Sequence, residues 1–394
     1  MRQHDSMTPT GYHRIMLYSI PSLTSEDERV LAEVDTRRER LRHQVLGTPA
    51  KWTAGLRKSL TADAIAGSNT IEGYRVDSRD VEDLLDGERE VATSEENKAE
   101  TLAYQNAMTY IQSLHDVPDF AYSKGLLNGL HWMLQGHHHP QRLAGQWRRR
   151  GAWINEPGRP DVAAYVTPDA DRLPALMSEL VDWLNDGDPD THFLLRAALA
   201  HLNLVNIHPW ADGNGRMSRS LQTLLIARGG VLAPEFSSIE AWLGAPGNTW
   251  EYYKVLKTAG PEWSPDRDTR PWIRFNLLAY HQQAQLVGFR IERSNRCWTD
   301  LEEFAAAHGI DERQITALHD AALVGRVRRA RYQRAENLSG QQAVRDMRAL
   351  TDAGLLEAVG NTKARFYVPG ARFPAHVLER AAGPVRLTDP YAAD

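Results

Sequence analysis

The sequence has one cysteine, Cys297, in 394 residues. A single thiol excludes an internal disulfide and any multi-cysteine zinc or iron–sulfur site, so Cys297 is predicted to be a small core residue. No stretch reaches the roughly 18 uninterrupted apolar residues that a membrane-spanning helix needs. The first residues also lack the apolar core of a signal peptide. We therefore expect a cytoplasmic protein with no membrane partner.

The chain has no large excess of charge of either sign. Its net charge is -5, which provides no global attraction to nucleic acid or anionic membrane, so any basic surface must be local. Apolar residues make up 42% and charged residues 25%, as in ordinary soluble globular proteins. The length is too great for one ordinary core, and two or three domains are expected.

Apolar residues recur at helical spacing along most of the chain, which predicts a mainly α-helical fold. The expected helices lie within 22–60, 101–114, 123–134, 173–184, 190–206, 214–228 and 272–287. One segment differs: GQWRRRGAWI at 145–154, followed by a Gly/Pro turn and AAYVTP, is typical of a short β-hairpin.

Changes in composition suggest four parts of the chain. The polar, acidic stretch 84–97 predicts a loop and a subdivision near residue 90, which separates an N-terminal helical region, 1–90, from a core, 91–291. Arginines become dense after about residue 292, so 292–384 is predicted to be a further domain. The short polar end, 385–394, should be loosely held.

Residues 207–219 read IHPWADGNGRMSR and gather several reactive residue types between two helices. An apolar stripe downstream predicts that a helix begins at about Asn214, with Gly213 and Gly215 at its N-terminus. Free N–H groups and the positive end of the helix dipole form an anion site there, and glycines let phosphate oxygens approach. We expect a phosphate chain as the ligand.

The neighbouring side chains suit chemistry on that phosphate chain. Arg216 and Arg219 lie on neighbouring positions of the same helix, where forked donors can grip further phosphate oxygens. Asp212 provides a hard carboxylate of the kind that holds Mg²⁺. His208 can take a proton from a hydroxyl near neutral pH. A lone His-Pro turn or Gly-x-Gly is usually structural, but the combination favours an active site.

The string HPWADGNGRMSR resembles the signature of Fic-domain proteins, His-Pro-Phe-x-Asp/Glu-Gly-Asn-Gly-Arg-x-x-Arg, and differs only at Trp210, where the family usually has Phe. The resemblance covers roughly residues 60–290. It implies a helical Fic core that transfers AMP from ATP to a Tyr, Thr or Ser hydroxyl of a target protein or of itself, with release of pyrophosphate. The roles that it implies are base for His208, Mg²⁺ ligand for Asp212, phosphate cradle for Gly213, Asn214 and Gly215, and distal phosphate clamps for Arg216 and Arg219.

An upstream segment, SNTIEG at 68–73, is similar to the Ser/Thr-x-x-x-Glu-Gly/Asn inhibitory motif of many Fic proteins. Its place before the core fits the class with an N-terminal inhibitory helix. Ser68 and Glu72 would share one helix face, and Glu72 could pair with Arg219 and occupy the clamp that a γ-phosphate needs. The alternative is that Glu72 ends a surface helix that Gly73 caps.

The segment Gly145–Ile154 resembles the flap of the family, a hairpin that aligns the target segment by backbone pairing. We assign target docking to Trp147, Arg148, Trp153 and Ile154. The alternative is a structural hairpin whose arginines at 148–150 are solvated.

Tyr252 and Tyr253 fall where the family often has a Tyr-Tyr pair near the nucleotide, although core packing explains them equally well. His137, His138 and His139 could suggest a metal site. Adjacent residues cannot all point at one ion, however, and no partner cluster has metal-site spacing, so we interpret them as a solvated loop.

The C-terminal segment resembles a winged helix–turn–helix. Ser339 would cap a helix that runs to Leu350, and Arg365 to Val368 has strand character. Arginines 345 and 348 and Lys363 could face a nucleic-acid groove, but acidic residues interleave with them. Protein docking or dimerisation is therefore as good an interpretation as DNA binding.

The five arginines at 326, 328, 329, 331 and 334 form the one dense basic run, with a solvated helix face as the alternative. The competing function class is a DNA-binding regulator in which the nucleotide site is only a sensor or serves self-modification. Transfer of another phosphate-linked group, removal of AMP from a modified target and a homodimeric state are further alternatives.

Overall fold

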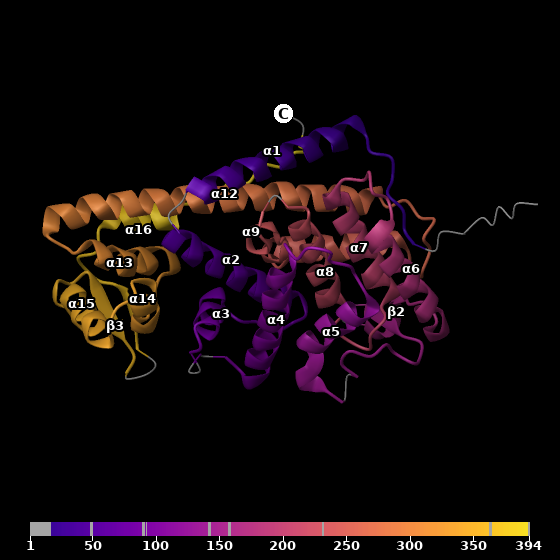
Figure 1. The fold of residues 1–394 in the computed structure, drawn as a ribbon, viewed down its shortest axis with the longest axis horizontal. Helices are drawn as coiled ribbons and strands as arrows, with labels where there is room; N and C mark the ends of the chain where they lie inside the picture. The colour runs from indigo at the N-terminus through magenta and orange to yellow at the C-terminus, as the bar shows by residue number, and fades with distance from the viewer. Residues whose placement is uncertain are drawn as a thin grey trace, which may run out of the picture.

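The computed structural model describes residues 17–47, 50–88, 91, 93–140, 143–156, 159–230, 232–361 and 365–392. This part of the chain is mainly helical, with two short antiparallel hairpins, as the sequence predicts (Figure 1). The first twelve helices are α1 Ser25–Gly47, α2 Ala50–Ile71, α3 Ser78–Leu85, α4 Glu95–Leu114, α5 Lys124–Gln135, α6 Leu173–Asp186, α7 Phe193–Ile207, α8 Asn214–Arg228, α9 Pro234–Ser237, α10 Glu240–Leu243, α11 Pro246–Leu256 and α12 Arg270–His308. The remaining helices are α13 Glu312–Val324, α14 Arg329–Ala335, α15 Gly340–Asp352 and α16 Ala375–Ala382.

Local capping explains several of the helix starts. The side chains of Ser94, Ser123 and Ser339 each accept a hydrogen bond from a backbone N–H in the first turn of α4, α5 and α15. The cap that we predicted at Ser339 is therefore confirmed. Helix α8 begins at Asn214, as predicted, with Gly213 in the capping position.

Helices α7 and α8 lie at the centre of the largest apolar cluster. All of α7 from Leu194 to Ile207 except Arg196 is buried, because its residues are apolar on nearly every face. The same cluster contains Val30 of α1, Ile65 of α2 and Trp272 of α12. The N-terminal helices thus share one core with the central helices, and the subdivision expected near residue 90 does not separate two apolar cores.

Helix α12 is the longest element and runs beside α1 across the molecule (Figure 1). The domain boundary expected near residue 292 falls inside this continuous helix. The apolar contacts nevertheless change there: Ile291 packs in a cluster with Leu41 and Phe236, whereas Cys297, which is buried as predicted, belongs to the C-terminal cluster. One helix therefore supplies apolar side chains to both ends of the molecule.

The C-terminal cluster is covered by α13, α14 and α15, and two strands follow them, β3 Leu356–Val359 and β4 Phe366–Pro369. The strands pair antiparallel, with Leu356 opposite Pro369. Helix α16 returns to pack on α12 (Figure 1). This is the element order that we expected, and its assignment to the winged helix–turn–helix class stays a prediction.

The last described residues are held more firmly than expected. The N–H and hydroxyl of Thr388 donate to the Gln285 side chain at 2.9 and 3.0 Å. The Tyr391 hydroxyl donates to Asp27 at 3.2 Å, and Arg274 lies over its ring. The expectation of a loose end at 385–394 is therefore wrong for residues 388–391, because α1 and α12 present polar partners that local composition cannot reveal.

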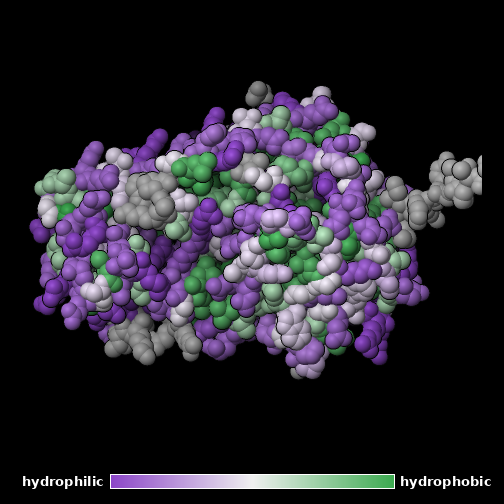
Figure 2. All heavy atoms as spheres, in the orientation of Figure 1, coloured by the Kyte–Doolittle hydropathy of each residue, from purple (hydrophilic) through white to green (hydrophobic). Residues whose placement is uncertain are grey.

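The face of the molecule in Figure 2 is mostly hydrophilic, with apolar side chains in small separate groups. Within the described ranges, none of the helices combines the length and the apolar character needed to cross a bilayer.

Candidate active site

The loop between α7 and α8 is held in shape by Asn214 and Trp210. The Asn214 side chain accepts from the Trp210 N–H at 3.1 Å and donates to the Trp210 carbonyl at 2.9 Å. The Trp210 ring is fully buried, stacks on His131 with centroids 4.7 Å apart, and donates to Asn128 at 3.0 Å. Asn128 thus satisfies the one polar atom that Trp has and Phe lacks, which explains how this loop accommodates the larger ring.

Asn214 therefore has a different task from the one that we assigned to it. Its side-chain amide is committed to Trp210, so its contribution to an anion site would come from the main-chain N–H. The first N–H groups of any α-helix have no partner within the helix. The start of α8 thus presents backbone donors beside the positive end of the helix dipole.

Two positions at this helix start require glycine. Gly213 has φ 76°, and a Cβ there would lie 2.7 Å from the Gln135 amide nitrogen. A Cβ at Gly215 would lie 2.5 Å from a Glu72 carboxylate oxygen. The cradle is thus narrow, and the Glu72 carboxylate lies against it.

His208 ends α7 in the left-handed conformation, with φ 52° and ψ 56°. Its Nδ1 lies 3.1 Å from the Val205 carbonyl, so Nδ1 carries the proton and Nε2 keeps a lone pair. Burial lowers the pKa of His208 to about 4, and the Arg148 guanidinium acts in the same direction. The imidazole is therefore neutral at neutral pH, as a general base must be.

Arg148 positions this histidine. Its side-chain Nε donates to the His208 carbonyl at 2.8 Å, and its backbone N–H donates to the Pro209 carbonyl at 2.9 Å. The side chain is only 6% exposed. Neither target docking nor a solvated arginine describes it, because its donors are engaged by loop carbonyls.

Asp212 lies partly buried immediately before the cradle. One carboxylate oxygen accepts from the Gly213 N–H at 2.7 Å, and its carbonyl accepts from His131 Nε2 at 2.9 Å. These bonds fix a single carboxylate beside the phosphate site. That donor set fits Mg²⁺, which usually takes one or two protein oxygens together with waters and substrate phosphates.

Arg219 is 1% exposed and contacts the segment 68–72. Its Nη2 donates to Glu72 at 2.7 Å, and its Nε donates to the Ser68 hydroxyl at 2.8 Å. Burial alone would lower the pKa of Arg219, but the Glu72 carboxylate outweighs it and raises the pKa well above the usual value. Within the described chain, Nη1 of Arg219 has no partner, so one buried donor remains for a ligand.

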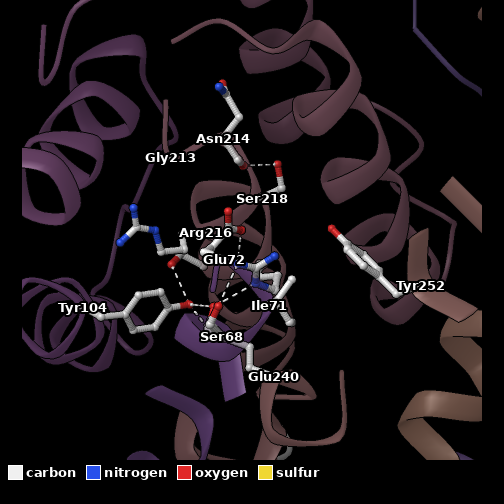
Figure 3. Close-up of polar contacts among 12 residues, drawn as sticks. Ser68, Ile71, Glu72, Tyr104, Gly213, Asn214, Arg216, Ser218, Glu240 and Tyr252 are labelled. Carbon is white, nitrogen blue, oxygen red and sulfur yellow. Dashed lines mark hydrogen bonds and ion pairs between the residues drawn. The ribbon is translucent and has the colours of Figure 1, made fainter. Parts of the chain in front are cut away.

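A buried network fixes Ser68 beneath Arg219. The Ser68 hydroxyl donates to the Tyr104 hydroxyl at 3.0 Å, and Tyr104 in turn donates to Glu240 (Figure 3). Burial raises the pKa of Glu240. Helix α2 also approaches α10 closely, because a Cβ on Gly67 would lie 2.4 Å from the Glu240 carbonyl. Tyr104, Glu240 and Gly67 were not predicted, since their contacts join residues far apart in sequence.

Both interpretations of Glu72 hold in part. Gly73 has φ 91° and follows the last turn of α2, as a helix-ending glycine should. The Glu72 side chain nevertheless turns inward to Arg219 rather than to solvent. The end of α2 thus places a carboxylate in the predicted γ-phosphate clamp.

Arg216 faces a different carboxylate. It is buried and pairs with the fully buried Glu100 of α4, and its guanidinium lies 5.5 Å from the centroid of the Tyr74 ring. Burial would raise the pKa of Glu100, but Arg216 and His138 lower it to about 2. The second predicted clamp is therefore tied to α4.

The flap is shorter than predicted. Residues 145–152 form bends and irregular backbone rather than a strand, and the hairpin consists of β1 Trp153–Glu156 and β2 Arg159–Val166. Trp153 is 63% exposed and Ile154 is also exposed, so both are available for contact. Trp147 instead packs partly buried against the core, beneath the Lys124 ammonium.

Tyr252 and Tyr253 lie in different environments. Tyr252 is buried, with its hydroxyl 3.0 Å from His201 Nε2, as core packing predicts. Tyr253 is 40% exposed and donates to the Ile71 carbonyl at 3.2 Å. Tyr253 thus contacts the end of α2 next to Glu72.

The interpretation of His137, His138 and His139 as a solvated loop holds only in part, because His137 and His139 are exposed but His137 and His138 contact a buried carboxylate. Their Nε2 atoms lie 3.2 and 2.6 Å from one oxygen of Glu100. Sequence spacing could not indicate this, because Glu100 lies on α4, far back along the chain.

The basic run 326–334 is not a solvated face over most of its length. Four of its arginines pair with acidic residues of α3 and the turn after it. Lys363, a predicted groove contact outside this run, is not among the described residues. The pairs are Arg326 with Asp80 and Asp83, Arg328 with Asp83, Arg331 with Glu82, and Arg334 with Asp86. These charges join the C-terminal part to the helix that follows α2.

Comparison with known proteins shows which family this part of the chain is similar to. The model of the Fic/DOC family matches residues 122–226, which contain the loop from His208 to Arg219. This segment is a Fic domain. Proteins named protein adenylyltransferase Fic from Nematostella vectensis and Drosophila melanogaster are 27% and 31% identical over 262 and 259 residues. These alignments cover 65% and 64% of this chain, and 55% and 46% of the relatives, so the chain spans about half the length of the curated relatives that it matches.

A solved structure shows the same fold over most of the Fic-domain chain. A Fic family protein from Desulfovibrio desulfuricans G20 superposes with a TM-score of 0.56 at 22% identity, covering 90% of this chain and 98% of that one.

Proposed function

We propose that this Fic-domain protein is a protein adenylyltransferase. In the proposed reaction, His208 Nε2 accepts the proton of a Tyr, Thr or Ser hydroxyl of a target protein or of the chain itself. The hydroxyl oxygen forms a bond to the α-phosphorus of ATP, the bond to the bridging oxygen breaks, and pyrophosphate leaves. The observation that carries the proposal is a neutral imidazole whose Nδ1 donates to the Val205 carbonyl, so that Nε2 is the proton-accepting nitrogen, next to a glycine-lined helix N-terminus.

Within this proposal, Asp212 would hold Mg²⁺. The ion would neutralise phosphate charge as the leaving group departs. The N–H groups at the start of α8 would bind phosphate oxygens, and the unpartnered Nη1 of Arg219 would add a charged donor.

The same geometry supports autoinhibition by Glu72. Its carboxylate lies against the Gly215 position and pairs with Arg219, where a terminal phosphate would bind. Two anions cannot share that clamp without repulsion, so ATP would bind weakly or in a pose unsuited to attack. Ser68 and Tyr253 support Glu72 by bonding to Arg219 and to the end of α2.

Target docking would use the exposed Trp153 and Ile154 of the flap. A cytoplasmic location, a homodimer, and protein or DNA docking through the C-terminal part stay predictions. The pairing of the arginines at 326–334 with α3 favours protein docking over DNA, since it withdraws that basic run from any groove. Arg345, Arg348 and Lys363 stay the predicted groove contacts.

The test compares the full chain, the Glu72→Gly variant and a variant that also carries His208→Ala. Each is incubated with labelled ATP, Mg²⁺ and lysate, and label on protein is measured with mass spectrometry for added AMP. We expect more label in Glu72→Gly than in the parent, and a loss of roughly 100-fold or more when His208 is also removed. Equal labelling in all three proteins would refute the assignment.

A further inference from the structure

Glu100 lies at the junction of α4, α8 and the short turn η1, Gly136–His138, that follows α5. Its side chain is fully buried, and its two oxygens face different partners. One oxygen, Oε2, pairs with Arg216, whereas Oε1 lies 3.2 Å from His137 Nε2 and 2.6 Å from His138 Nε2. Three ligand atoms thus meet at one point, all within 4.8 Å of one another.

The 3-10 turn explains how adjacent histidines reach the same oxygen. Within η1 the two rings lie side by side, with centroids 4.0 Å apart and planes inclined at 43°. Each side chain is only about a fifth exposed, at 23% and 20%. His139, the next residue, turns to the Trp132 ring instead, with centroids 5.0 Å apart.

We propose that Glu100, His137 and His138 form a binding site for a divalent transition-metal ion of the zinc class. Two imidazoles and one carboxylate make a donor set typical of Zn²⁺ with an open position for water. Imidazole nitrogen suits zinc, copper and nickel, whereas Mg²⁺ prefers oxygen donors, so this site would be selective against the Mg²⁺ expected at Asp212.

Arg216 stabilises the site rather than blocking it. Its guanidinium occupies Oε2 and orients the carboxylate so that Oε1 points to the histidines. Such orientation of a ligand by a second partner is common in metal sites. A bound ion would separate His138 Nε2 from Oε1 slightly, since zinc ligands lie about 2.0–2.2 Å from the metal, and would tie η1 to α4.

This site is separate from the proposed transfer of AMP. Its ligands come from α4 and η1, whereas the proposed base and cradle lie on the loop between α7 and α8. Occupancy would fix Glu100, and through it the position of Arg216 behind the cradle. The site can therefore be tested by binding alone, whether or not the protein transfers AMP.

The test uses tag-free full-length protein, stripped with chelator, and Zn²⁺ alone as the titrant in calorimetry. Co²⁺ replaces it in a parallel titration, because its visible absorption reports the coordination geometry. The variants are His137→Ala and His138→Ala, with His139→Ala as the matched control. Circular dichroism and a thermal melt establish that each variant is folded.

We expect one ion per chain in the parent and in His139→Ala, unaffected by excess Mg²⁺. Loss of either His137 or His138 should weaken binding by at least the roughly 10- to 100-fold that follows loss of an outer partner. Absence of stoichiometric binding in the parent would overturn the proposal and leave His137 and His138 as hydrogen-bonding partners of Glu100 rather than metal ligands. Equal affinity in all three variants would overturn it as well.

Discussion

Two regions of this protein, the cradle and the junction between α14 and α3, use arginine charge differently. Arg219 at the cradle has Glu72 as its one carboxylate partner among the described residues, and its Nη1 is left without a partner there. Arg331 at the junction between α14 and α3 is paired with both Glu82 and Asp320. The cradle is thus an anion-binding site occupied by one removable carboxylate, whereas the junction is an ionic contact in which Arg331 already pairs with two carboxylates. The predictions below test this contrast.

The largest expected effect is a loss of folding stability at low pH. Around the cradle, burial lowers the pKa of His131, His201 and His208 to about 4, 3 and 4. Since these values lie below the ordinary 6.5, the unfolded chain binds more protons as the pH falls through this window. Stability is fully present above about pH 6.5 and is lost below it, by roughly 2 kcal/mol for each histidine at pH 5.

Denaturant unfolding at several pH values measures this loss. Hydrogen exchange locates it, and protection should fall first in α7 and α8 rather than at the junction of α3 with α14. Loss of protection first at that junction would contradict the contrast.

The next effect concerns Arg331. Replacing it with Met removes the partner of two largely buried carboxylates, Glu82 and Asp320, and should destabilise the protein by about 3 kcal/mol. Thermal or denaturant unfolding measures the change. Restoration of most of the stability by adding Glu82→Gln and Asp320→Asn would show that unpaired charge, rather than lost packing, is the cause.

A smaller effect is expected for Glu72→Gly. This change leaves Arg219 buried, but the Ser68 hydroxyl and carbonyl still accept from it, so we expect a loss of about 1–2 kcal/mol without nucleotide. Mg-ATP should raise the melting temperature of the variant more than that of the parent. An equal shift in both proteins would show that Glu72 does not compete with the nucleotide.

The smallest effect should be that of Arg348→Ala. Arg348 and Asp352 are 81% and 70% exposed, and such pairs contribute less than about 0.5 kcal/mol. The unfolding free energy should stay unchanged within error. A gel shift at two salt concentrations then tests DNA contact by this residue independently of folding, because loss of a phosphate contact in the variant would reduce the salt dependence of binding.

Much of the cradle was predictable from sequence because it is local. The start of α8 and the glycines at 213 and 215 follow from a dozen consecutive residues. The partners were not predictable: Arg216 meets Glu100 from 116 positions away, and Arg326 meets Asp80 from 246. Arg148 illustrates the same limit. The composition of its segment indicates an exposed flap, and only the folded loop brings the His208 and Pro209 carbonyls to the arginine.

The domain boundary predicted near residue 292 does not coincide with a break in secondary structure, because composition does not reveal where a helix ends. A change in composition marks where one apolar cluster yields to another, but the backbone of α12 continues because nothing in that stretch stops a helix. Gly309 is the first residue there in a left-handed conformation, and it ends the helix.

Because α12 is continuous, it also fixes the orientation of the C-terminal part about the helix axis relative to the central helices. Its 39 residues form a helix about 58 Å long, and each residue adds a rotation of about 100° about the helix axis. One residue gained or lost near its middle would rotate α14 away from the acidic face of α3. A change of seven residues would nearly restore the rotation but would shift α14 by about 10 Å along the axis, so the contact between α14 and α3 fixes the length of this helix.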